Sequence, residues 1–353
     1  MRGAVTWWLA PTYQMAGQVW RDLKMTLRTY PGLMISEADH RILFPDGGEI
    51  TIRSTHYPDN LRGAGLDFAV LDEVAFMEPL VWPQVVRPML LERRGGALFL
   101  STPYGRNHFW ELFRVGLDPE EAEWAAFHFT SLDNPLISFD DLRTIQRTTP
   151  KRIFQEEYMA EFLSDAGQVF RGIQEAVRNP ARTQPEPGKR YIGGVDWGRE
   201  DDYTCIVLLD ADTGQMVAMD RFHQIGWALQ RSRLKTLCDK WRPAVIWAEE
   251  NSIGTVNIEA LQAEGLPVRP FQTTARSKSP LIEGLALAIE QGEVGLLPDD
   301  VLLHELAAYT MERMAGGGYR YGAPPGGHDD TVIALALAWH GVKHGGGMRL
   351  DFA

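Results

Sequence analysis

Short, uninterrupted apolar runs bounded by turn or polar residues recur along the first half of the chain. They lie at residues 5–10, 68–71 and 96–100. A strand that is buried on both faces of a sheet has this continuous pattern, because both of its sides lie against apolar neighbours. Between the runs, residues 13–30 and 80–93 have apolar residues at helical spacing. The first half is therefore predicted to be an α/β domain with a parallel sheet.

A stretch rich in proline and polar residues, at 179–190, separates this half from one with a different pattern. Three strand-like runs follow it in close succession, at 191–195, 203–210 and 215–222, and Asp212–Thr213–Gly214 is typical of a hairpin. Helical and strand-like segments then alternate, which predicts an α/β domain with a mixed sheet. The predicted helices lie around 234–241 and at 256–264, 280–291, 301–313 and 332–340, with a strand at 244–248 and another between the helices.

The length of the chain fits two domains, because its 353 residues are about twice those of a typical domain. We place the first domain at residues 1–164, a linker at 165–190 and the second domain at 191–353. The longest apolar run, Val332 to Trp339, is far shorter than the roughly 20 residues of a membrane-spanning helix. Because the N-terminus also has no secretory pattern, we expect a soluble intracellular protein.

Charge and cysteine content narrow the class of function. The chain has 35 basic and 47 acidic residues and a net charge of −12, so its overall charge is poorly suited to coating nucleic acid. Cys205 and Cys238 are the only cysteines, and neither is close to a histidine in the sequence. Neither a disulfide framework nor a zinc site made of thiolates is expected. Any bound metal is therefore expected to be held by carboxylates.

The apolar run 68–71 ends in two acids, Asp72 and Glu73. At the carboxyl end of a parallel strand, an Asp can hold the magnesium of a nucleotide while a Glu orients an attacking water. A strand that simply ends in solvated acids explains the same pair. The next run ends in Ser101–Thr102–Pro103, and two neighbouring strand ends with polar residues favour a binding site. Arg62, beside a glycine, either reaches a phosphate or caps a turn.

One part of a nucleotide-driven motor does not occur in this sequence. It is the loop G-x-x-x-x-G-K-[ST], whose amide groups and lysine hold the phosphates. Gly188–Lys189 lies in the predicted linker and lacks the preceding glycine. We therefore expect that this chain, as given, does not bind ATP in that way.

Acids occur at three widely separated places in the second half. Asp196 follows two glycines in the first strand, Glu249–Glu250 end a later strand, and Asp329–Asp330 open the apolar helix. An α/β sheet can bring all three places to one edge, where oxygen ligands suit two divalent cations about 3.5–4 Å apart that promote phosphodiester cleavage. Acids at a helix start also serve as caps. Asp196, however, is costly to bury inside an apolar strand unless it is paired or bound to a metal.

Some polar residues near these acids have two interpretations. His328 either shuttles a proton beside the metals or satisfies a loop carbonyl. The basic residues from Arg231 to Arg242, and the polar basic loop at 273–278, either contact DNA phosphates or form solvated surface.

Seven motifs, taken in chain order, resemble those of the large terminase subunit of tailed bacteriophages. The likeness spans nearly the whole chain, and the order of the motifs is more specific than any one of them. The motifs are Ala10–Pro11–Thr12–Tyr13, Leu61–Arg62–Gly63, Val70–Leu71–Asp72–Glu73, Ser101–Thr102–Pro103, Gly194–Val195–Asp196–Trp197–Gly198, Glu249–Glu250–Asn251–Ser252–Ile253–Gly254 and His328–Asp329–Asp330. The resemblance implies a partial P-loop NTPase-type domain followed by a ribonuclease H-like nuclease domain. Such proteins package viral DNA into a preformed capsid and cut concatemeric double-stranded DNA.

The resemblance also implies roles for residues of the first domain. Asp72 would be the magnesium-associated Walker B acid and Glu73 the catalytic glutamate, while Ser101 and Thr102 would belong to the coupling motif. Arg62 resembles an arginine that in some members is proposed to complete the ATP site of a neighbouring subunit. The family's P-loop precedes the Ala-Pro-Thr-Tyr segment, so we expect a shortened N-terminus or a misplaced start codon, with ATP bound only by a full-length form.

In the second domain, the resemblance makes Asp196, Glu249 and one or both of Asp329 and Asp330 the ligands of Mg²⁺ or Mn²⁺. Within the doublets, the E-x-N form favours Glu249, and we favour Asp330. The implied partners are double-stranded viral DNA, the small terminase subunit and the portal or procapsid, on which a ring of subunits would form. The implied location is the host cytoplasm, without contact to a membrane.

Two other functions fit parts of the sequence. One is a non-enzymatic prophage remnant or a docking module of the packaging machine, against which the intact set of acids argues. The other is a stand-alone nuclease of the same fold, such as a relative of resolvases or integrases. The retained Asp72–Glu73 and Ser101–Thr102–Pro103 argue against that nuclease, since it would need no motor.

Overall fold

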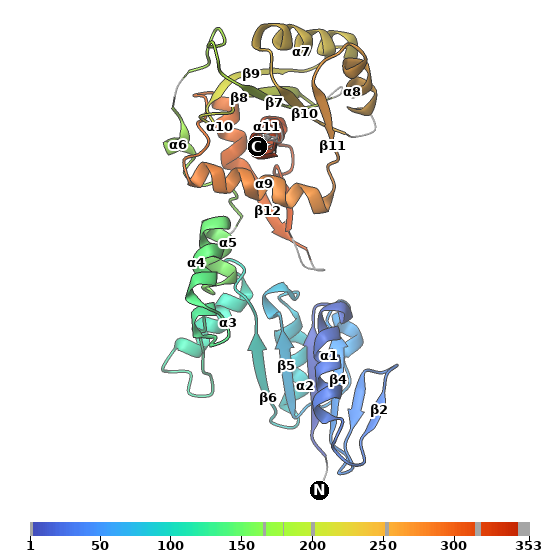
Figure 1. The fold of residues 1–353 in the computed structure, drawn as a ribbon. Coiled ribbons are helices and arrows are strands. Elements are labelled where there is room, and N and C mark those ends of the chain that lie inside the picture. Colours follow the sequence, from blue (N-terminus) through green and yellow to red (C-terminus); the bar gives the residue numbers. More distant parts are fainter. Residues whose placement is uncertain are drawn as a thin grey trace, which may run out of the picture. The chain divides into compact units, whose positions relative to one another are not determined.

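The computed structural model describes residues 3–164, 167–178, 180–198, 202–250, 254–314 and 319–344. The chain forms two compact units, each of which is considered by itself (Figure 1). Unit 1 comprises Met1–Leu142, Arg152–Ala166 and Arg313–Gly318, and unit 2 comprises Arg143–Lys151, Gly167–Glu312 and Tyr319–Ala353. Within the described ranges, no helix combines the length and the apolar character that crossing a membrane requires.

Unit 1 is built on a six-stranded sheet in the order β2-β3-β4-β1-β5-β6. The predicted parallel arrangement is confirmed, because β1 pairs in parallel with β4 and β5, and β5 with β6. The strands β2, β3 and β4 were not predicted, and the antiparallel β2 and β3 extend the sheet beyond β4. The strands are β1 Val5–Ala10, β2 Met34–Ser36, β3 Arg41–Leu43, β4 Glu49–Ser54, β5 Phe68–Asp72 and β6 Gly96–Leu100.

Helices cover both faces of this sheet. On one face, Ala16 and Trp20 of α1 (Tyr13–Leu27) pack with Ile42 and Ile52 of the sheet. The side chain of Thr12 starts α1 by accepting a hydrogen bond from the backbone of Met15. The other face is covered by turns and helices that include the η3 and α2 segments. These elements are η1 Pro58–Leu61, η2 Val74–Phe76, η3 Val81–Val86, α2 Arg87–Leu91 and α3 His108–Leu117, followed along the chain by η4 Ser131–Asp133, α4 Phe139–Thr148 and α5 Lys151–Glu157.

Unit 2 is built on a five-stranded sheet in the order β11-β10-β7-β8-β9, and the predicted mixed character of this sheet is confirmed. Its first three strands form an antiparallel meander, and β10 and β11 add to it in parallel with β7. The strands are β7 Tyr191–Asp196, β8 Thr204–Asp210, β9 Met216–Phe222, β10 Val245–Glu249 and β11 Val268–Phe271.

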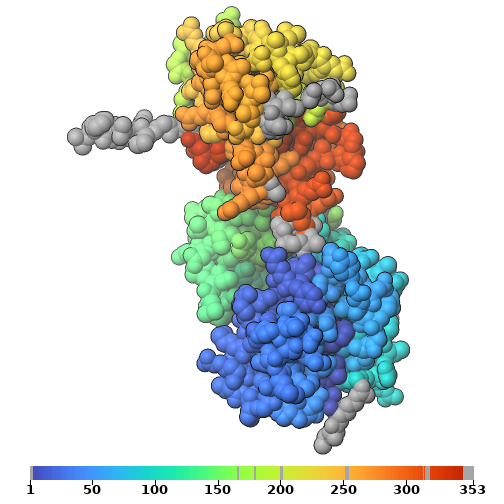
Figure 2. Space-filling model, turned by 90° about the vertical axis from the view of Figure 1, so that its right-hand side faces the viewer, coloured from blue at the N-terminus to red at the C-terminus, as the bar shows by residue number. Residues whose placement is uncertain are grey.

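The two faces of this sheet have separate apolar cores. Val195 and Ile246 pack against α7 (Trp227–Trp241) and α8 (Gly254–Ala263), which form the outer surface seen at the top of Figure 2. Cys205 and Val207 face the other way, toward α9, α10 and α11 (Figure 1). These three helices span Ala275–Glu290, Asp300–Ala308 and Asp330–His344.

Two segments of unit 2 differ from the pattern read in the sequence. The helix predicted over 301–313 ends early, because α10 stops at Ala308 and Thr310–Arg313 forms β12, which pairs with β13 (Tyr319–Gly322). Within the predicted linker, Phe170 and the short helix α6 (Ile173–Ala176) lie in the core of unit 2. Residues 165, 166 and 179 of that linker lie outside the described ranges.

Candidate metal centre

Asp196 stands at the carboxyl end of β7, a strand of which all six residues are buried. The neighbouring parallel strand β10 ends at Glu249, and the register pairs Val195 with Ala248, so the two acids that follow them come side by side. Asp196 is only 9% exposed. Burial, together with the charge of Glu249 and a hydrogen bond to it, raises the pKa of Asp196 well above its ordinary value.

The acids at the start of α11 complete this cluster. Asp330 begins the helix and is buried, and Asp329 directly precedes it. The charges of both add to the rise in the pKa of Asp196. Burial and the neighbouring carboxyl groups of Asp202 and Glu305 raise the pKa of Asp330 itself to about 8. The structure thus brings together the four acids Asp196, Glu249, Asp329 and Asp330 from three separate places in the sequence.

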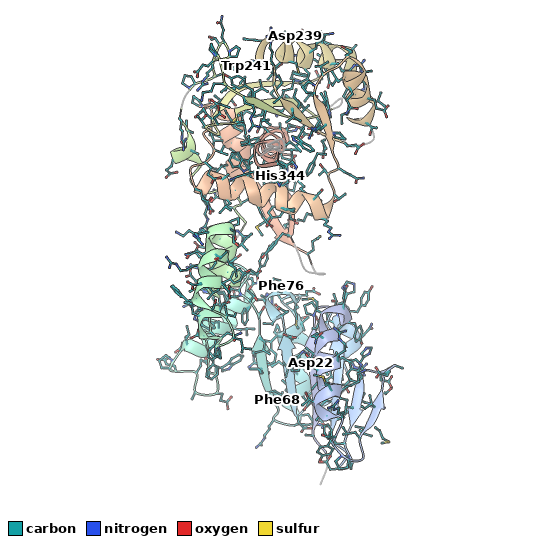
Figure 3. All side chains as sticks on the ribbon, in the orientation of Figure 1. Asp22, Phe68, Phe76, Asp239, Trp241 and His344 are labelled. Atoms are coloured by element: carbon teal, nitrogen blue, oxygen red, sulfur yellow. The ribbon has the colours of Figure 1, made fainter. Side chains whose placement is uncertain are left out.

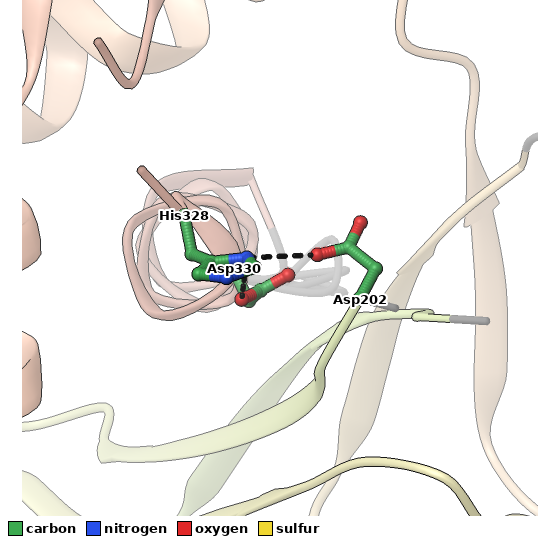
Figure 4. Close-up of side chains that lie close together, drawn as sticks. All are labelled: Asp202, His328 and Asp330. Carbon is green, nitrogen blue, oxygen red and sulfur yellow. Dashed lines mark hydrogen bonds and ion pairs between the residues drawn. The ribbon is translucent and has the colours of Figure 1, made fainter. Parts of the chain in front are cut away.

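The exposed side chains of Asp202 and His328 lie beside the buried Asp330 (Figure 4). His328 Nδ1 lies 3.4 Å from Asp202 Oδ1 and 4.0 Å from Asp330 Oδ2. One ligand atom from each of these three residues lies within 4.8 Å of the others, which is close enough for a shared cation. The sequence analysis missed Asp202. Its signal was the acidic run at 200–202, a few residues after the end of β7, of which residues 200 and 201 lie outside the described ranges.

The two acids of the helix doublet have different cationic partners. Lys278 Nζ lies 3.3 Å from Asp329 Oδ2, and Arg221 Nη2 lies 3.3 Å from Asp330 Oδ2. Lys278 belongs to the stretch that the sequence analysis read as a basic loop, but α9 begins at Ala275 and places this lysine in its first turn. Residues 251–253 of the motif that begins at Glu249 lie outside the described ranges.

In unit 1, the acids that end β5 and the hydroxyl that follows β6 come together, because β5 and β6 are parallel neighbours. The indole Nε1 of Trp8 donates a hydrogen bond to Asp72 Oδ2 at 3.1 Å. The Ser101 hydroxyl donates to Glu73 Oε2 at 3.3 Å and accepts from the backbone of Ala75. Glu73 has a positive φ of 56°, a backbone strain of the kind that is concentrated at functional sites.

Arg62 has local partners at the end of η1. Its Nε lies 3.0 Å from Asp59 Oδ1, and its Nη1 donates to the carbonyl of Gln84 at 2.9 Å. These contacts are those expected of an arginine that caps a turn. Thr102 directly follows Ser101, whose hydroxyl also donates to the Thr102 carbonyl.

Two family models match this chain. The model described as the N-terminal part of the large terminase subunit, T4likevirus-type, matches residues 13–177. The model described as the terminase RNaseH-like domain matches residues 193–340. Among solved structures, a large terminase from a thermophilic bacteriophage has a TM-score of 0.50 and 16% identity over 96% of this chain and 86% of that chain, a likeness of fold. The large terminase nuclease of the thermophilic phage G20c has a TM-score of 0.46 and 31% identity over 49% of this chain and 98% of that chain.

Curated relatives carry the same family name. The "Terminase, large subunit" of Thermus virus P23-45 is 30% identical over 99% of this chain and 81% of its own length. The protein of that name from Escherichia phage T5 is 31% identical over 46% of this chain and 38% of its own length. With the fold of both units and the order of the motifs, these matches identify the chain as a member of the phage large terminase subunit family.

Proposed function

We propose that unit 2 is a divalent-cation-dependent endonuclease that cuts concatemeric double-stranded viral DNA during genome packaging. The observation that carries this proposal is the convergence of Asp196, Glu249, Asp329 and Asp330 at one edge of the mixed sheet. The match of this unit to the terminase RNaseH-like domain supports it. Asp196 and Asp330 are buried next to other acids, and gathering carboxylates in this way weakens a fold, so a purely structural role accounts poorly for the cluster.

The donor set fits a hard divalent cation such as Mg²⁺ or Mn²⁺. All four acids offer carboxylate oxygens, the ligands that these ions prefer. We expect Asp196, Glu249 and Asp330 to hold the cations directly, with Asp329, Asp202 and His328 beside them. When bound, a pair of such ions supplies an activated water and stabilises the leaving oxygen of the phosphodiester.

The remaining residues would position the substrate and move protons. The imidazole of His328 is 40% exposed and lies between two carboxyl groups, where it can accept a proton and release it to solvent. Lys278, held beside Asp329, can contact a backbone phosphate of the DNA that enters the site. Lys278 would thus serve both as the ion-pair partner of Asp329 and as a phosphate contact.

For unit 1 we propose the role of an ATPase-type motor domain. The placement of Asp72, Glu73 and Ser101 at neighbouring strand ends supports this role, as does the family match over residues 13–177. ATP hydrolysis would need a phosphate-binding loop, a motif that this sequence does not contain. The expected partners are the small terminase subunit and the portal of the procapsid, in the host cytoplasm.

A plasmid-cleavage assay tests the nuclease. The purified chain is incubated with supercoiled plasmid and Mg²⁺ or Mn²⁺, and nicked and linear products are measured with and without a chelator. We expect cation-dependent cutting that falls about 100-fold or more in Asp196→Asn and Glu249→Gln, since loss of even an outer partner of a metal ligand costs about 10- to 100-fold. Asp239→Asn is the matched control, because Asp239 is exposed on α7 (Figure 3), which packs on the face of the sheet opposite to α11.

The outcomes separate the nuclease from a docking module. Equal cutting by Asp196→Asn and the wild type would assign the activity to a contaminant or another site. A folded wild-type chain that cuts with neither cation would overturn the proposal and favour a non-enzymatic role on the portal. Loss of cutting in Asp239→Asn would show that the assay responds to general damage rather than to the site.

A further inference from the structure

Arg221 is the part of unit 2 that the proposed chemistry leaves unexplained. It lies on β9 in register with Cys205 of β8, which is in turn in register with Asp196 of β7. Directly paired residues on neighbouring strands point to the same face of a sheet. Arg221 therefore faces α10 and α11, on the side of the sheet where the acids gather. The register of the strands thus places the positive charge of Arg221 next to the acids.

The guanidinium of Arg221 is held on three sides. Its Nη2 lies 2.9 Å from Glu305 Oε1 and 3.3 Å from Asp330 Oδ2. Its Cζ lies 3.5 Å from the centre of the Tyr203 ring, which covers it. The same ring makes an edge contact with His328 at 5.1 Å. With only 16% of the side chain exposed, these contacts hold Arg221 more firmly than an ion pair on the surface.

Glu305 anchors this arrangement from α10. While Oε1 accepts from Arg221, Oε2 accepts from both the backbone amide and the hydroxyl of Thr331, at 3.0 and 2.6 Å. Both carboxylate oxygens of this buried acid are thus engaged, although it lies close to Asp330. Glu305 therefore caps the first turn of α11 and holds Arg221 in place. We assign its two oxygens to these hydrogen bonds rather than to a cation.

We propose that Arg221 is a positioning residue that, anchored by Glu305, fixes the carboxylate of Asp330 for cation binding and so sets the cation affinity of the site. This inference rests on the proposed nuclease function and deepens it. Arg221 on β9 contacts both Glu305 of α10 and Asp330 at the start of α11. Asp330 is also one of the acids expected to bind the divalent cation. Removing Arg221 takes away one of the contacts that hold the Asp330 carboxylate in place, so part of the ordering must then come from cation binding.

The direction in which the cation affinity changes when Arg221 is replaced distinguishes the positioning role from two simpler roles. A residue that only offsets negative charge would weaken cation binding, so its removal would tighten it. A residue that only stabilises the fold would lower the unfolding temperature and leave the cation affinity of the folded protein unchanged. The positioning role predicts weaker cation binding in a folded protein, in spite of one positive charge less beside the acids.

Calorimetric titration of the purified chain with Mn²⁺ alone is the test. We expect Arg221→Gln to bind Mn²⁺ about 10- to 100-fold more weakly than the wild type, and Arg221→Lys to fall between them. Glu305→Gln should weaken binding in the same direction, because it loosens the anchor and keeps an acceptor for Thr331. The matched control is Arg233→Gln. Arg233 makes a bidentate ion pair at the surface with Asp220, which precedes Arg221 on β9.

Circular dichroism first establishes that each variant is folded, and Arg221→Lys keeps the test usable if Arg221→Gln is not. Unchanged or tighter Mn²⁺ binding in folded Arg221→Gln or Arg221→Lys would overturn the inference. Equal weakening in Arg233→Gln would overturn it as well, because the effect would then not belong to this contact. Failure of the wild type to bind Mn²⁺ and to cut plasmid would instead refute the nuclease proposal on which the inference rests.

Discussion

Gly194 of β7 lies against the backbone of α11 at Ala334, so closely that a Cβ at Gly194 would collide with the Ala334 carbonyl oxygen. Ala334 is one helical turn beyond Asp330, and Asp196 is two residues beyond Gly194 on the same face of the strand. The close approach of helix and strand therefore sets how near the two acids come. Gly194, which has no side chain to take part in the chemistry, therefore helps to position the acids of the candidate metal centre.

Gly194→Ala is expected to destabilise unit 2 and to weaken divalent-cation binding together. The added methyl forces α11 away from β7, and overpacking of this kind costs about 1–3 kcal/mol or more. The same movement carries Asp330 away from Asp196. Urea unfolding followed by tryptophan fluorescence measures the first effect, and Mn²⁺ titration of the folded variant measures the second.

The control for this substitution is Gly284→Ala in the middle of α9. Apart from the backbone of α9 itself, no atom of the described residues lies within 4 Å of a Cβ at that position, so the change should be neutral or stabilising by up to about 1 kcal/mol. Wild-type stability in Gly194→Ala would contradict the tight contact between β7 and α11.

Much of the fold could be predicted because its central strands have a clear sequence pattern. Runs such as Val5–Ala10 and Thr204–Asp210 are nearly all apolar, and few other structures bury such a run on both sides. The strands β2 and β3 have only three residues each and carry polar or exposed side chains, so no period marks them. β12 was read as the end of a helix because the four residues Thr310–Arg313 carry no strand pattern of their own, and their strand structure depends on pairing with β13.

The acids of the site could be predicted because each one breaks a strong local pattern. Asp196 interrupts a buried strand, and Asp330 opens a helix that is apolar nearly all round. Arg221 and Glu305 gave no such signal, since a charged residue in a half-exposed strand or a short helix is ordinary. Their importance comes from contacts between residues more than 80 positions apart, which a single sequence does not reveal.

A second prediction concerns a buried ion pair in unit 1. Arg152 Nη1 lies 2.5 Å from Glu156 Oε2, and the two side chains are 2% and 1% exposed. Glu156 Oε1 also accepts a hydrogen bond from the backbone of Gly105, so it ties α5 to the turn that follows β6. Arg152→Met leaves a buried carboxylate without this partner and should cost about 3–5 kcal/mol in urea unfolding.

The double variant Arg152→Met/Glu156→Met should be more stable than Arg152→Met alone, because neither member of this pair is then buried without the other. It should remain less stable than the wild type, since the Gly105 amide loses its acceptor. Lys24→Met, which removes one partner of the exposed pair with Glu37, should change stability little. A double variant less stable than the single one would contradict this account.

Both cysteines should be unreactive in the folded protein. Cys205 and Cys238 are buried, burial raises the pKa of both thiols, and that of Cys238 rises to about 12. At pH 8 only about one Cys238 in 10⁴ would be a thiolate, the form that reacts. Ellman's reagent should therefore label neither cysteine in native buffer and both in guanidinium. Because both lie in unit 2, rapid labelling of either one in native buffer would reveal local opening of that unit.

Unit 1 should lose stability in mild acid through His108. The ring Nε2 of His108 lies 2.9 Å from the carbonyl of Val74, to which the neutral ring can donate. Burial lowers the pKa of His108 below 6.5, an effect that the contact with Val74 only partly offsets. The unfolded chain therefore binds a proton more readily than the folded one. The stabilising contribution is complete above pH 6.5 and is lost as the pH falls through the folded-state pKa.

Replacing the imidazole isolates this contribution. His108→Gln keeps a side chain that can donate to Val74 but does not titrate, so the stability of the wild type relative to this variant should fall as the pH is lowered from 7.5 to about 5. NMR titration of the His108 ring provides a direct check in the native state. A midpoint at or above 6.5 would contradict the assignment, because the folded protein would then hold the proton at least as well as the unfolded chain does.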